Sequence, residues 1–514
     1  MIAKTLSGAV KGIDAIIVEV QCDVSRGLPS FKIVGLPEKE VQESRDRIKS
    51  AIGNSGYEFP TKSITANLAP ADVKKEGVGL DLPIASTILR ATDQLAEGSL
   101  SNKILIGELS LDGQLREVSG VLPVVLAARE DPDIDEILVP EGNAREAAIV
   151  DSLEVYPVSN LKEAIDLLDK DGREAADCYS FDREGYFESR GEFSKDFSDV
   201  KGQEGAKRAL EIAAAGGHNV LMSGPPGSGK SMLAKRLPTI LPPLSFEEAI
   251  EVTKIYSILG ELSATNPLVT RRRVRAPHHT ISYAGMVGGG HGNPTPGEIS
   301  LAHNGVLFLD ELPEFNRRVL ETLRQPLEDQ EITISRASNS YRFPANFSLV
   351  GAMNPCPCGY LGDDLKKCNC RPHEIRRYRK KISGPFMDRI DVFVDVQRLD
   401  KEEMTDRSRG KKSKMIRERV TTARRLQSER FDCQGATNSL MSAEQVEKFC
   451  QLDKSAESLI EQAIDQYGFS ARAYHKVLKI SRTIADLDES DRIYPEHVSE
   501  AVQYRSTREK ILRK

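Results

Sequence analysis

The sequence predicts three folded parts in succession: an α+β domain, an α/β core around a parallel sheet, and a helical region. Residues 1–169 alternate short β-like runs with helical stretches. Residues 196–398 alternate strands and helices in the order that gives a parallel sheet with crossover connections. Residues 399–514 are almost free of glycine and keep helical spacing. The 514 residues are also enough for about three domains.

Individual elements can be placed in the first and last parts. In the first part, we expect strands at residues 15–20, 31–34, 63–67, 104–106 and 137–139, and helices at 82–91 and 121–129. Residues 170–195 lack periodicity and are rich in Asp, Arg, Glu, Gly and Ser, so we expect a linker there. In the last part, we expect helices at residues 414–431, 442–450, 454–466, 471–487 and 495–504.

The composition indicates a soluble globular protein. Hydrophobic residues make up 39% and charged residues 29%, which excludes a collagen, a mucin-like stalk and wholesale disorder. The apolar runs are far shorter than the roughly 18 residues of a membrane span, and the N-terminus has no secretory apolar stretch. We therefore expect a cytoplasmic protein without a membrane partner, in which the 8 cysteines are free thiols or metal ligands. The net charge of −6 gives no overall nucleic-acid-binding signature, so any such binding must come from local basic clusters.

The clearest motif is a phosphate-binding loop. It consists of Gly224, Pro225, Pro226, Gly227, Ser228, Gly229, Lys230 and Ser231. An apolar run precedes it and a helical stretch follows, which is the context that the motif G-x-x-x-x-G-K-[ST] requires. The glycines let backbone N–H groups turn toward phosphates. Lys230 is expected to reach the β- and γ-phosphates, and Ser231 to ligate Mg²⁺. The alternative is an ordinary glycine-rich turn.

A second motif supplies two acids. The apolar run at residues 305–309 is followed by Asp310 and Glu311, and open α/β sheets bind their ligands at the carboxyl ends of the strands. We expect Asp310 to hold Mg²⁺ and Glu311 to polarise the attacking water. Adjacent acids after a strand are also common as a solvated helix start. Together the two motifs predict phosphoryl transfer to water.

At this point the residues resemble a known family. Residues 199–203 (Asp-Val-Lys-Gly-Gln), both nucleotide motifs and residues 384–391 (Gly-Pro-Phe-Met-Asp-Arg-Ile-Asp) resemble the magnesium-chelatase-like AAA+ ATPases, specifically the YifB/ComM group. The resemblance covers essentially the whole chain. It implies an AAA+ core at 196–398, a helical lid at 399–514, ATP and Mg²⁺ as cofactors, and a hexameric ring. It also implies a DNA helicase that promotes branch migration in recombination and natural transformation.

Three further positions take their roles from this resemblance. Asn354 matches the sensor-1 residue, which orients the lytic water or contacts the γ-phosphate. Arg389 matches the arginine finger, which enters the nucleotide site of the neighbouring subunit, and Arg472 matches the sensor-2 arginine of the lid. Because such a finger contributes about 10³ to 10⁵ in turnover, a monomer is expected to be nearly inert. The alternatives are a strand-end cap for Asn354 and surface ion pairs for the two arginines.

The first part carries a second resemblance. Residues 75–81 and 107–113 are similar to the protease domain of Lon, which has the ribosomal protein S5 domain 2-like fold. Lon-type proteolysis needs a serine activated by a lysine, and Gly79 and Leu122 occupy those positions here. We therefore expect the domain at 1–169 to be non-proteolytic and to serve in docking or in engaging DNA.

A cysteine cluster lies within the core. Cys356, Cys358, Cys368 and Cys370 form two close pairs. Four thiolates are the ligand count of a closed tetrahedral Zn²⁺ site, although the C-x-C spacing is tighter than the usual two to four intervening residues. A structural zinc is thus a candidate cofactor, and free or redox-active thiols are the alternative.

Local basic residues suggest what the motor acts on. We expect a hairpin from residues 331–336 and 341–343. In related ring ATPases such a hairpin contacts DNA phosphates, so Arg336 and Arg342 are candidates. Further basic residues crowd segments 271–275, 371–381 and 407–419, where solvated faces or subunit contacts are the alternative. We expect single-stranded or branched DNA as the partner of a homo-oligomer. A chelatase-like or chaperone-like remodeller of a protein is the alternative, and a non-hydrolysing binding module is a third.

Overall fold

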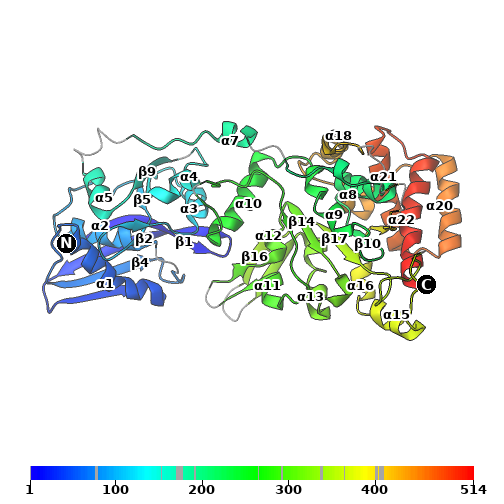
Figure 1. Cartoon of the computed structure of the whole chain (residues 1–514). Coiled ribbons are helices and arrows are strands. Elements are labelled where there is room, and N and C mark those ends of the chain that lie inside the picture. Colours follow the sequence, from blue (N-terminus) through cyan, green and yellow to red (C-terminus); the bar gives the residue numbers. More distant parts are fainter. Residues whose placement is uncertain are drawn as a thin grey trace.

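The chain forms two sheet-containing parts and a helical region that follow one another along an elongated molecule (Figure 1). This computed structural model describes residues 2–75, 79–151, 153–169, 177–189, 193–263, 265–290, 293–335, 340–363, 365–399, 403 and 410–513. The N-terminal sheet lies at one end in Figure 1, the second sheet near the middle, and the C-terminal helices at the other end. Within the described residues, no helix combines the length and the apolar character needed to cross a bilayer.

The N-terminal part is built on a seven-stranded sheet in the order β3-β4-β2-β1-β5-β8-β9. Its strands are β1 (Ile2–Lys11), β2 (Asp14–Ser25), β3 (Ser30–Val34), β4 (Ser63–Ala69), β5 (Lys103–Leu105), β8 (Glu136–Pro140) and β9 (Glu154–Val158). Its helices are α1 (Lys39–Asn54), α2 (Asp81–Ala91), α3 (Val121–Ala128), α4 (Ala144–Ala147) and α5 (Leu161–Leu168), and β6 (Glu108–Leu109) pairs with β7 (Leu115–Arg116). β1 and β2 form a long antiparallel hairpin, whereas β5, β8 and β9 run parallel to β1.

The strands and helices expected in this part are present as β2, β3, β4, β5, β8, α2 and α3. The sequence pattern did not indicate β1, β9 or α1. The sequence pattern does not predict β1 because its buried face consists of Ala3, Thr5, Ser7 and Ala9. The strand therefore shows no alternation of apolar and polar residues. The Ser7 hydroxyl is satisfied inside the sheet, where it donates to the Leu105 carbonyl at 2.8 Å.

The central part is built on a five-stranded sheet in the order β11-β14-β17-β10-β18, and every pair of neighbours is parallel. The strands are β11 (Val274–Arg275), β14 (Gly305–Leu309), β17 (Phe347–Met353), β10 (Val220–Ser223) and β18 (Val392–Asp395). This confirms the predicted parallel sheet. Because all five strands point the same way, their carboxyl ends lie on one side of the sheet and their amino ends on the opposite side. We call these two sides the carboxyl edge and the amino edge.

Helices and two hairpins surround this sheet. The helices are α8 (Glu204–Gly216), α9 (Lys230–Ala234), α10 (Phe246–Ile258), α11 (Tyr283–Val287), α12 (Glu298–Leu301), α13 (Arg317–Thr322), α14 (Pro326–Asp329), α15 (Pro372–Arg379) and α16 (Gly384–Met387). β12 (Gly288–Gly289) pairs with β13 (Thr295–Pro296), and β15 (Glu331–Ser335) pairs with β16 (Ser340–Pro344) in the hairpin that the sequence predicts. α8 ends where Gly217 adopts φ of 71°, a conformation that glycine takes without strain.

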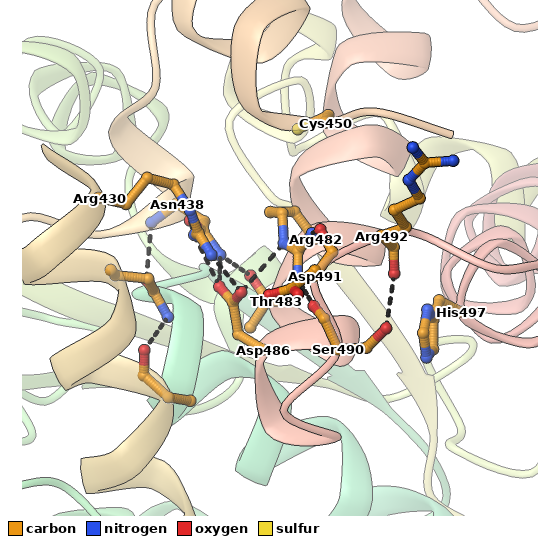
Figure 2. A network of polar contacts seen from close by, with 12 residues as sticks. Arg430, Asn438, Cys450, Arg482, Thr483, Asp486, Ser490, Asp491, Arg492 and His497 are labelled. Carbon is orange, nitrogen blue, oxygen red and sulfur yellow. Dashed lines mark hydrogen bonds and ion pairs between the residues drawn. The ribbon is translucent and has the colours of Figure 1, made fainter. Parts of the chain in front are cut away.

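The C-terminal part consists of helices that pack back onto the central part. These helices are α18 (Ser413–Phe431), α19 (Ala443–Phe449), α20 (Lys454–Tyr467), α21 (Ala471–Leu487) and α22 (Pro495–Arg513), close to the predicted ranges. α18 and α21 pack on α8, and α22 packs on β18. Figure 2 shows the polar centre of this region, where Arg430 and Arg482 both pair with the buried Asp486. This shared carboxylate ties α18 to α21 in the interior of the region.

The N-terminal part docks onto the central part through α10. An apolar cluster joins Val121 and Leu122 of α3 to Ala249 of α10. Polar contacts flank it: Lys254 pairs with Asp14 of the β1–β2 turn, and the Ser257 hydroxyl donates to the buried Glu146. These contacts fix the N-terminal part to the helix that begins beside the amino edge of the central sheet.

The segment expected to be a linker is partly helical. In its described residues, 177–189 and 193–195, it contains α7 (Arg183–Ser189). Phe187 lies 6.3 Å, ring to ring, from Phe246 at the start of α10. Aromatic packing therefore holds this connection against both flanking parts.

Candidate functional site

The phosphate-binding loop leaves the carboxyl end of β10 and leads into α9. Its first glycine allows a close backbone approach, because a Cβ at Gly224 would lie 2.1 Å from the Val396 carbonyl oxygen. Gly229, with φ of 93°, turns the chain into α9. Gln203 braces the loop, since its amide donates to the carbonyls of Ser228 and Gln397.

Lys230 is directed back into the loop. Its ammonium donates to the carbonyls of Gly224 at 2.6 Å and Pro225 at 2.9 Å. Burial lowers the pKa of Lys230, and the carboxylate of Asp310 opposes this shift. The cation is thus held at the mouth of the loop by carbonyl oxygens, which a phosphate group can replace.

Ser231 and Asp310 meet across the loop. The Ser231 hydroxyl donates to Asp310 Oδ2 at 2.6 Å, although the two residues belong to α9 and to the end of β14. A hydroxyl and a carboxylate oxygen side by side are the hard ligands that Mg²⁺ prefers. The arrangement fits the magnesium that the sequence predicts.

Glu311 follows Asp310 in a left-handed conformation, with φ of 51°. This conformation is uncommon for a residue other than glycine and places Glu311 at a functional edge of the sheet. Its carboxylate is more than half exposed and lies 3.1 Å from Nδ1 of His279. His279 is a site residue that sequence reasoning missed, because the pair His278-His279 offers only weak metal-binding evidence and the chain gives no sign that one of them faces Glu311.

Asn354 completes this edge of the sheet. β17, which ends just before it, lies between β10 and β14, so its end falls between the phosphate loop and the two acids. Asn354 Oδ1 lies 3.5 Å from the Lys230 ammonium. The structure therefore brings together the loop, Ser231, Asp310, Glu311 and Asn354 at the carboxyl edge.

Arg389 and Arg472 lie elsewhere. Both line a cleft of about 1130 Å³ whose walls include Asn219, Gly305 and Phe347. These three residues stand at the amino ends of β10, β14 and β17, which is the edge of the sheet opposite the phosphate loop. The two arginines therefore face away from the nucleotide loop of their own chain.

Contacts within the chain position Arg389. Its guanidinium pairs with Glu328 at 2.6 Å and donates to the Pro385 carbonyl at 2.7 Å. The Asn219 amide donates to the Arg389 carbonyl at 3.2 Å, which ties the segment to the start of β10. Arg472 is exposed in the first turn of α21, and its contacts within the described residues include no recorded ion pair.

A buried network of hydrogen bonds and ion pairs connects this edge to the C-terminal helices. His218 lies 2.8 Å from the Thr483 hydroxyl of α21 and 3.9 Å from the carboxylate of Asp391. Asp391 also pairs with Lys476 of α21 at 2.7 Å. Burial lowers the pKa of His218 to about 4, against the opposing effect of Asp391. In Figure 2, Thr483 lies beside Asp486. The network continues into the centre of the helical region through Asn438, whose side-chain amide donates to both residues.

Comparisons with known proteins place this geometry in a family. Models of the magnesium chelatase subunit ChlI match residues 196–404, its C-terminal region matches 410–505, and a third ChlI model matches 20–143. The chain is 44% identical over 508 residues to "Competence protein ComM" of Haemophilus influenzae, covering 98% of this chain and 97% of that protein. The chain belongs to the magnesium-chelatase-like ComM/YifB family.

This chain is also similar to two further proteins. It is 42% identical over 500 residues to "Uncharacterized protein YifB" of Escherichia coli, with 97% of this chain and 96% of that protein covered. It is 30% identical over 191 residues to "Lon protease 2" of Bacillus subtilis, a match that covers 32% of this chain and 33% of that protein. The family assignment confirms the first resemblance drawn from the sequence, and the family supports ATPase activity with ATP and Mg²⁺.

The four cysteines of this ComM/YifB family member lie together after β17. Their sulfur atoms all lie within 4.8 Å of one another, and three of the pairs are 3.4 to 3.6 Å apart. With Zn–S bonds of about 2.3 Å, a tetrahedron places its sulfurs about 3.8 Å apart, so the spacing fits a Zn²⁺ site. Burial works to raise the pKa of the Cys358 thiol, but the N–H groups of Tyr360 and Asn369 outweigh it and lower the pKa to about 6. Burial raises the pKa of the Cys356 thiol to about 12, so the thiols of the cluster differ in how readily they ionise.

Arg342, Leu122 and Gly79 are not among the residues that form the two edges described above. Arg342 is exposed on β16, in the hairpin with β15. Arg336 lies outside the described residues. In the N-terminal part, Leu122 is fully buried in the apolar cluster, and its backbone N–H donates to Glu146 at 2.9 Å. A Cβ at Gly79 would lie 3.2 Å from the side chain of Ile106.

Proposed function

We propose that this chain is a ring-forming ATPase that uses ATP hydrolysis to move DNA, with each hydrolysis site shared between two subunits. The observation that carries the proposal is the separation of the two half-sites. The phosphate loop and acids lie at the carboxyl edge of the central sheet, whereas Arg389 and Arg472 line a cleft at the amino edge. A complete set of groups around one nucleotide then needs two copies, arranged head to tail in a closed ring.

At the carboxyl edge, the chain's own groups bind and orient the substrate. The loop N–H groups and Lys230 hold the phosphates, and Ser231 and Asp310 would hold Mg²⁺, which neutralises the developing charge. Glu311 orients the attacking water, and Asn354 contacts the γ-phosphate end. Because Glu311 is paired with His279 in this structure, its carboxylate must turn toward the water when the site is assembled.

The neighbouring subunit supplies the cations. Arg389 leaves Glu328 for the phosphate oxygens, where a charge-assisted contact is stronger than a single exposed ion pair. Arg472 approaches from α21 in the same cleft. The buried network of His218 and Asp391 joins α21 to the Arg389 segment. Both arginines therefore move as one body with the helical lid.

DNA is the proposed load for two reasons. Basic side chains remain exposed on the central part, and a relative that is 44% identical to this chain is named a competence protein. Arg342 on the β15–β16 hairpin, and Arg336, which follows β15 in the sequence, are the proposed phosphate contacts. Stimulation of ATPase by single-stranded or branched DNA, lost at high salt, tests this load. A remodeller of a protein partner instead shows no stimulation and no DNA binding even at low salt.

We also propose that the cysteine cluster binds one structural zinc per chain. The four sulfurs form a closed set, and the site braces the segment between Asn354 and Arg389. Metal analysis of the purified protein should give one zinc per chain, and the variant Cys356→Ser/Cys368→Ser should lose it and unfold at a lower temperature. Absence of metal from both proteins would contradict the proposal.

A further inference from the structure

A concave basic surface lies beside the cysteine cluster, on α15 and the start of α13. The cavity has a volume of about 520 Å³. Its lining is basic apart from one phenylalanine: Phe315, Arg317, His373, Arg376, Arg377, Lys380 and Lys381. We call this set the α15 surface. It belongs to neither edge of the nucleotide site.

The fold separates the basic residues of α15 into two groups. Ile375, Tyr378 and Arg379 turn inward, and the Arg379 guanidinium donates to the Pro355 carbonyl at 3.1 Å. Arg376, Arg377 and Lys380 are exposed. Arg379 is therefore structural, while the other cations of the run are presented to solvent on one face.

These exposed cations have few counter-charges. Lys381 pairs with Glu314 at 2.7 Å. Within the described residues, no ion pair is recorded for Arg317, Arg376, Arg377 or Lys380. Arg376 and Arg377 lie in the last turn of α15, where the helix dipole favours cations, and Lys380 follows directly after it. The helix therefore accommodates a run of positive charge that stays available to a bound anion.

The surface is also pre-formed. α15 begins directly after the last cysteine of the cluster, and the Arg371 N–H donates to the Glu374 carboxylate at 2.7 Å in its first turn. The contact of Arg379 with Pro355 ties the end of the helix back to the segment that carries Cys356. A ligand therefore meets cations that are already in place.

We propose that the α15 surface binds the phosphodiester backbone of the nucleic acid on which the ATPase acts. The inference rests on the proposed function, and it names a site for the DNA beyond the β15–β16 hairpin. A protein interface is organised around apolar or aromatic anchors, but Phe315 is only 4% exposed and the rest of the lining is cationic. Sequence-independent contact with a nucleic acid needs cations and little else.

The position of the surface links it to the catalytic edge. Tyr378 lies on the inner side of α15 and is 7% exposed. Burial raises its pKa, and the nearby carboxylates of Glu314 and Glu311 add to that effect. The helix that carries the proposed DNA contacts thus packs, through Tyr378, toward the glutamate that orients the water.

The test compares two charge-matched triple variants of the full-length protein. Arg376→Gln/Arg377→Gln/Lys380→Gln removes cations of the α15 surface. Lys411→Gln/Lys412→Gln/Lys414→Gln removes the same charge from exposed positions at the start of α18. Binding of a fluorescent 30-nucleotide single strand and of the matching duplex is measured by anisotropy over a range of salt concentrations.

The α15 variant should show a salt slope, log K against log [salt], that is smaller by about 2 to 3, because each lost phosphate contact removes about 0.7 to 0.9. Its affinity near 0.1 M salt should fall by about tenfold or more, and the α18 variant should stay within about twofold of the wild type. Should the triple variant not fold, Arg377→Gln alone should lower the slope by about 0.7 to 0.9.

Four results would overturn the inference. A wild-type slope in the α15 variant, or an equal loss in the α18 variant, would show that this surface makes no specific contact with DNA. Loss of ring assembly with an unchanged slope would identify a contact between subunits instead. If the wild-type protein binds neither DNA at low salt, the proposed function itself fails, and the inference fails with it.

Discussion

The two edges of the central sheet differ in how their functional groups are held. At the carboxyl edge, the groups that would surround the phosphates already bond to one another: Lys230 to loop carbonyls, Ser231 to Asp310, and Glu311 to His279. At the amino edge, Arg389 and Arg472 line a wide cleft together with Lys476 and Lys479. At this second edge Arg389 pairs with Glu328 and Lys476 pairs with Asp391, while Arg472 is exposed. In the proposed function, each chain contributes one half to each of two separate sites.

The largest effect is expected at the amino edge. Arg389→Ala should lower the ATPase rate of the assembled protein by about 10³-fold or more, because the finger stabilises charge that develops only in the transition state. Nucleotide affinity of the isolated chain should be unchanged, since the loop is at the opposite edge. Arg389→Lys is the matched control, which keeps the charge but loses the planar fork and should recover little activity. A loss of nucleotide binding by the isolated Arg389→Ala chain would contradict the separation of the edges.

A change at the carboxyl edge should have the complementary signature. Glu311→Gln should slow turnover by about 10² to 10⁴-fold while ATP still binds, because the amide cannot accept the proton of the water. Lys230→Ala, by contrast, should abolish binding. Equilibrium binding of a fluorescent ATP analogue, measured beside the steady-state rate, separates the two. Normal turnover in Glu311→Gln would show that another group activates the water, whereas absence of turnover in the wild type would assign the protein to the non-hydrolysing class.

Arg472 should matter less than Arg389 and only in the assembled state. Arg472→Ala removes an exposed cation that reaches the cleft from α21, and we expect turnover to fall by about 10 to 100-fold. Arg425→Ala provides a control, since Arg425 also lines the cleft but lies within 3.4 Å of Glu429 on its own helix. The rate should be measured as a function of protein concentration. An effect that is the same in the monomer and in the ring would place Arg472 at the nucleotide of its own chain.

The smallest effect concerns the buried polar network that holds the amino edge to α21. The folded state lowers the pKa of His218 from 6.5 to about 4, so between these values the unfolded chain binds more protons than the folded one. Stability therefore falls as the pH drops through this window, by up to about 3 kcal/mol. His218→Asn should flatten this part of the stability profile, measured by urea unfolding at pH 7, 6 and 5. An unchanged profile in that variant would show that another group causes the loss.

The same comparison explains which parts of the site the sequence could predict. The loop, Ser231, Asp310 and Glu311 lie in two short motifs, each directly after an apolar strand, so local pattern and sheet topology are enough to place them. The cleft at the amino edge is lined by segments that span residues 217 to 479. No local pattern predicts that Arg389 pairs with Glu328 or that Lys476 pairs with Asp391. Arg379 teaches the same lesson within α15: its sequence neighbours are exposed cations, but helical geometry turns it inward to Pro355.

The central claim is tested most directly by mixing two inactive proteins, Glu311→Gln and Arg389→Ala, before assembly. In a mixed ring, each site formed by the loop of an Arg389→Ala subunit and the Arg389 of a Glu311→Gln neighbour has both groups. We expect the equimolar mixture to recover up to about a quarter of wild-type turnover, since about a quarter of random neighbour pairs have this order. A mixture that assembles but stays as slow as its components would contradict a site shared between subunits.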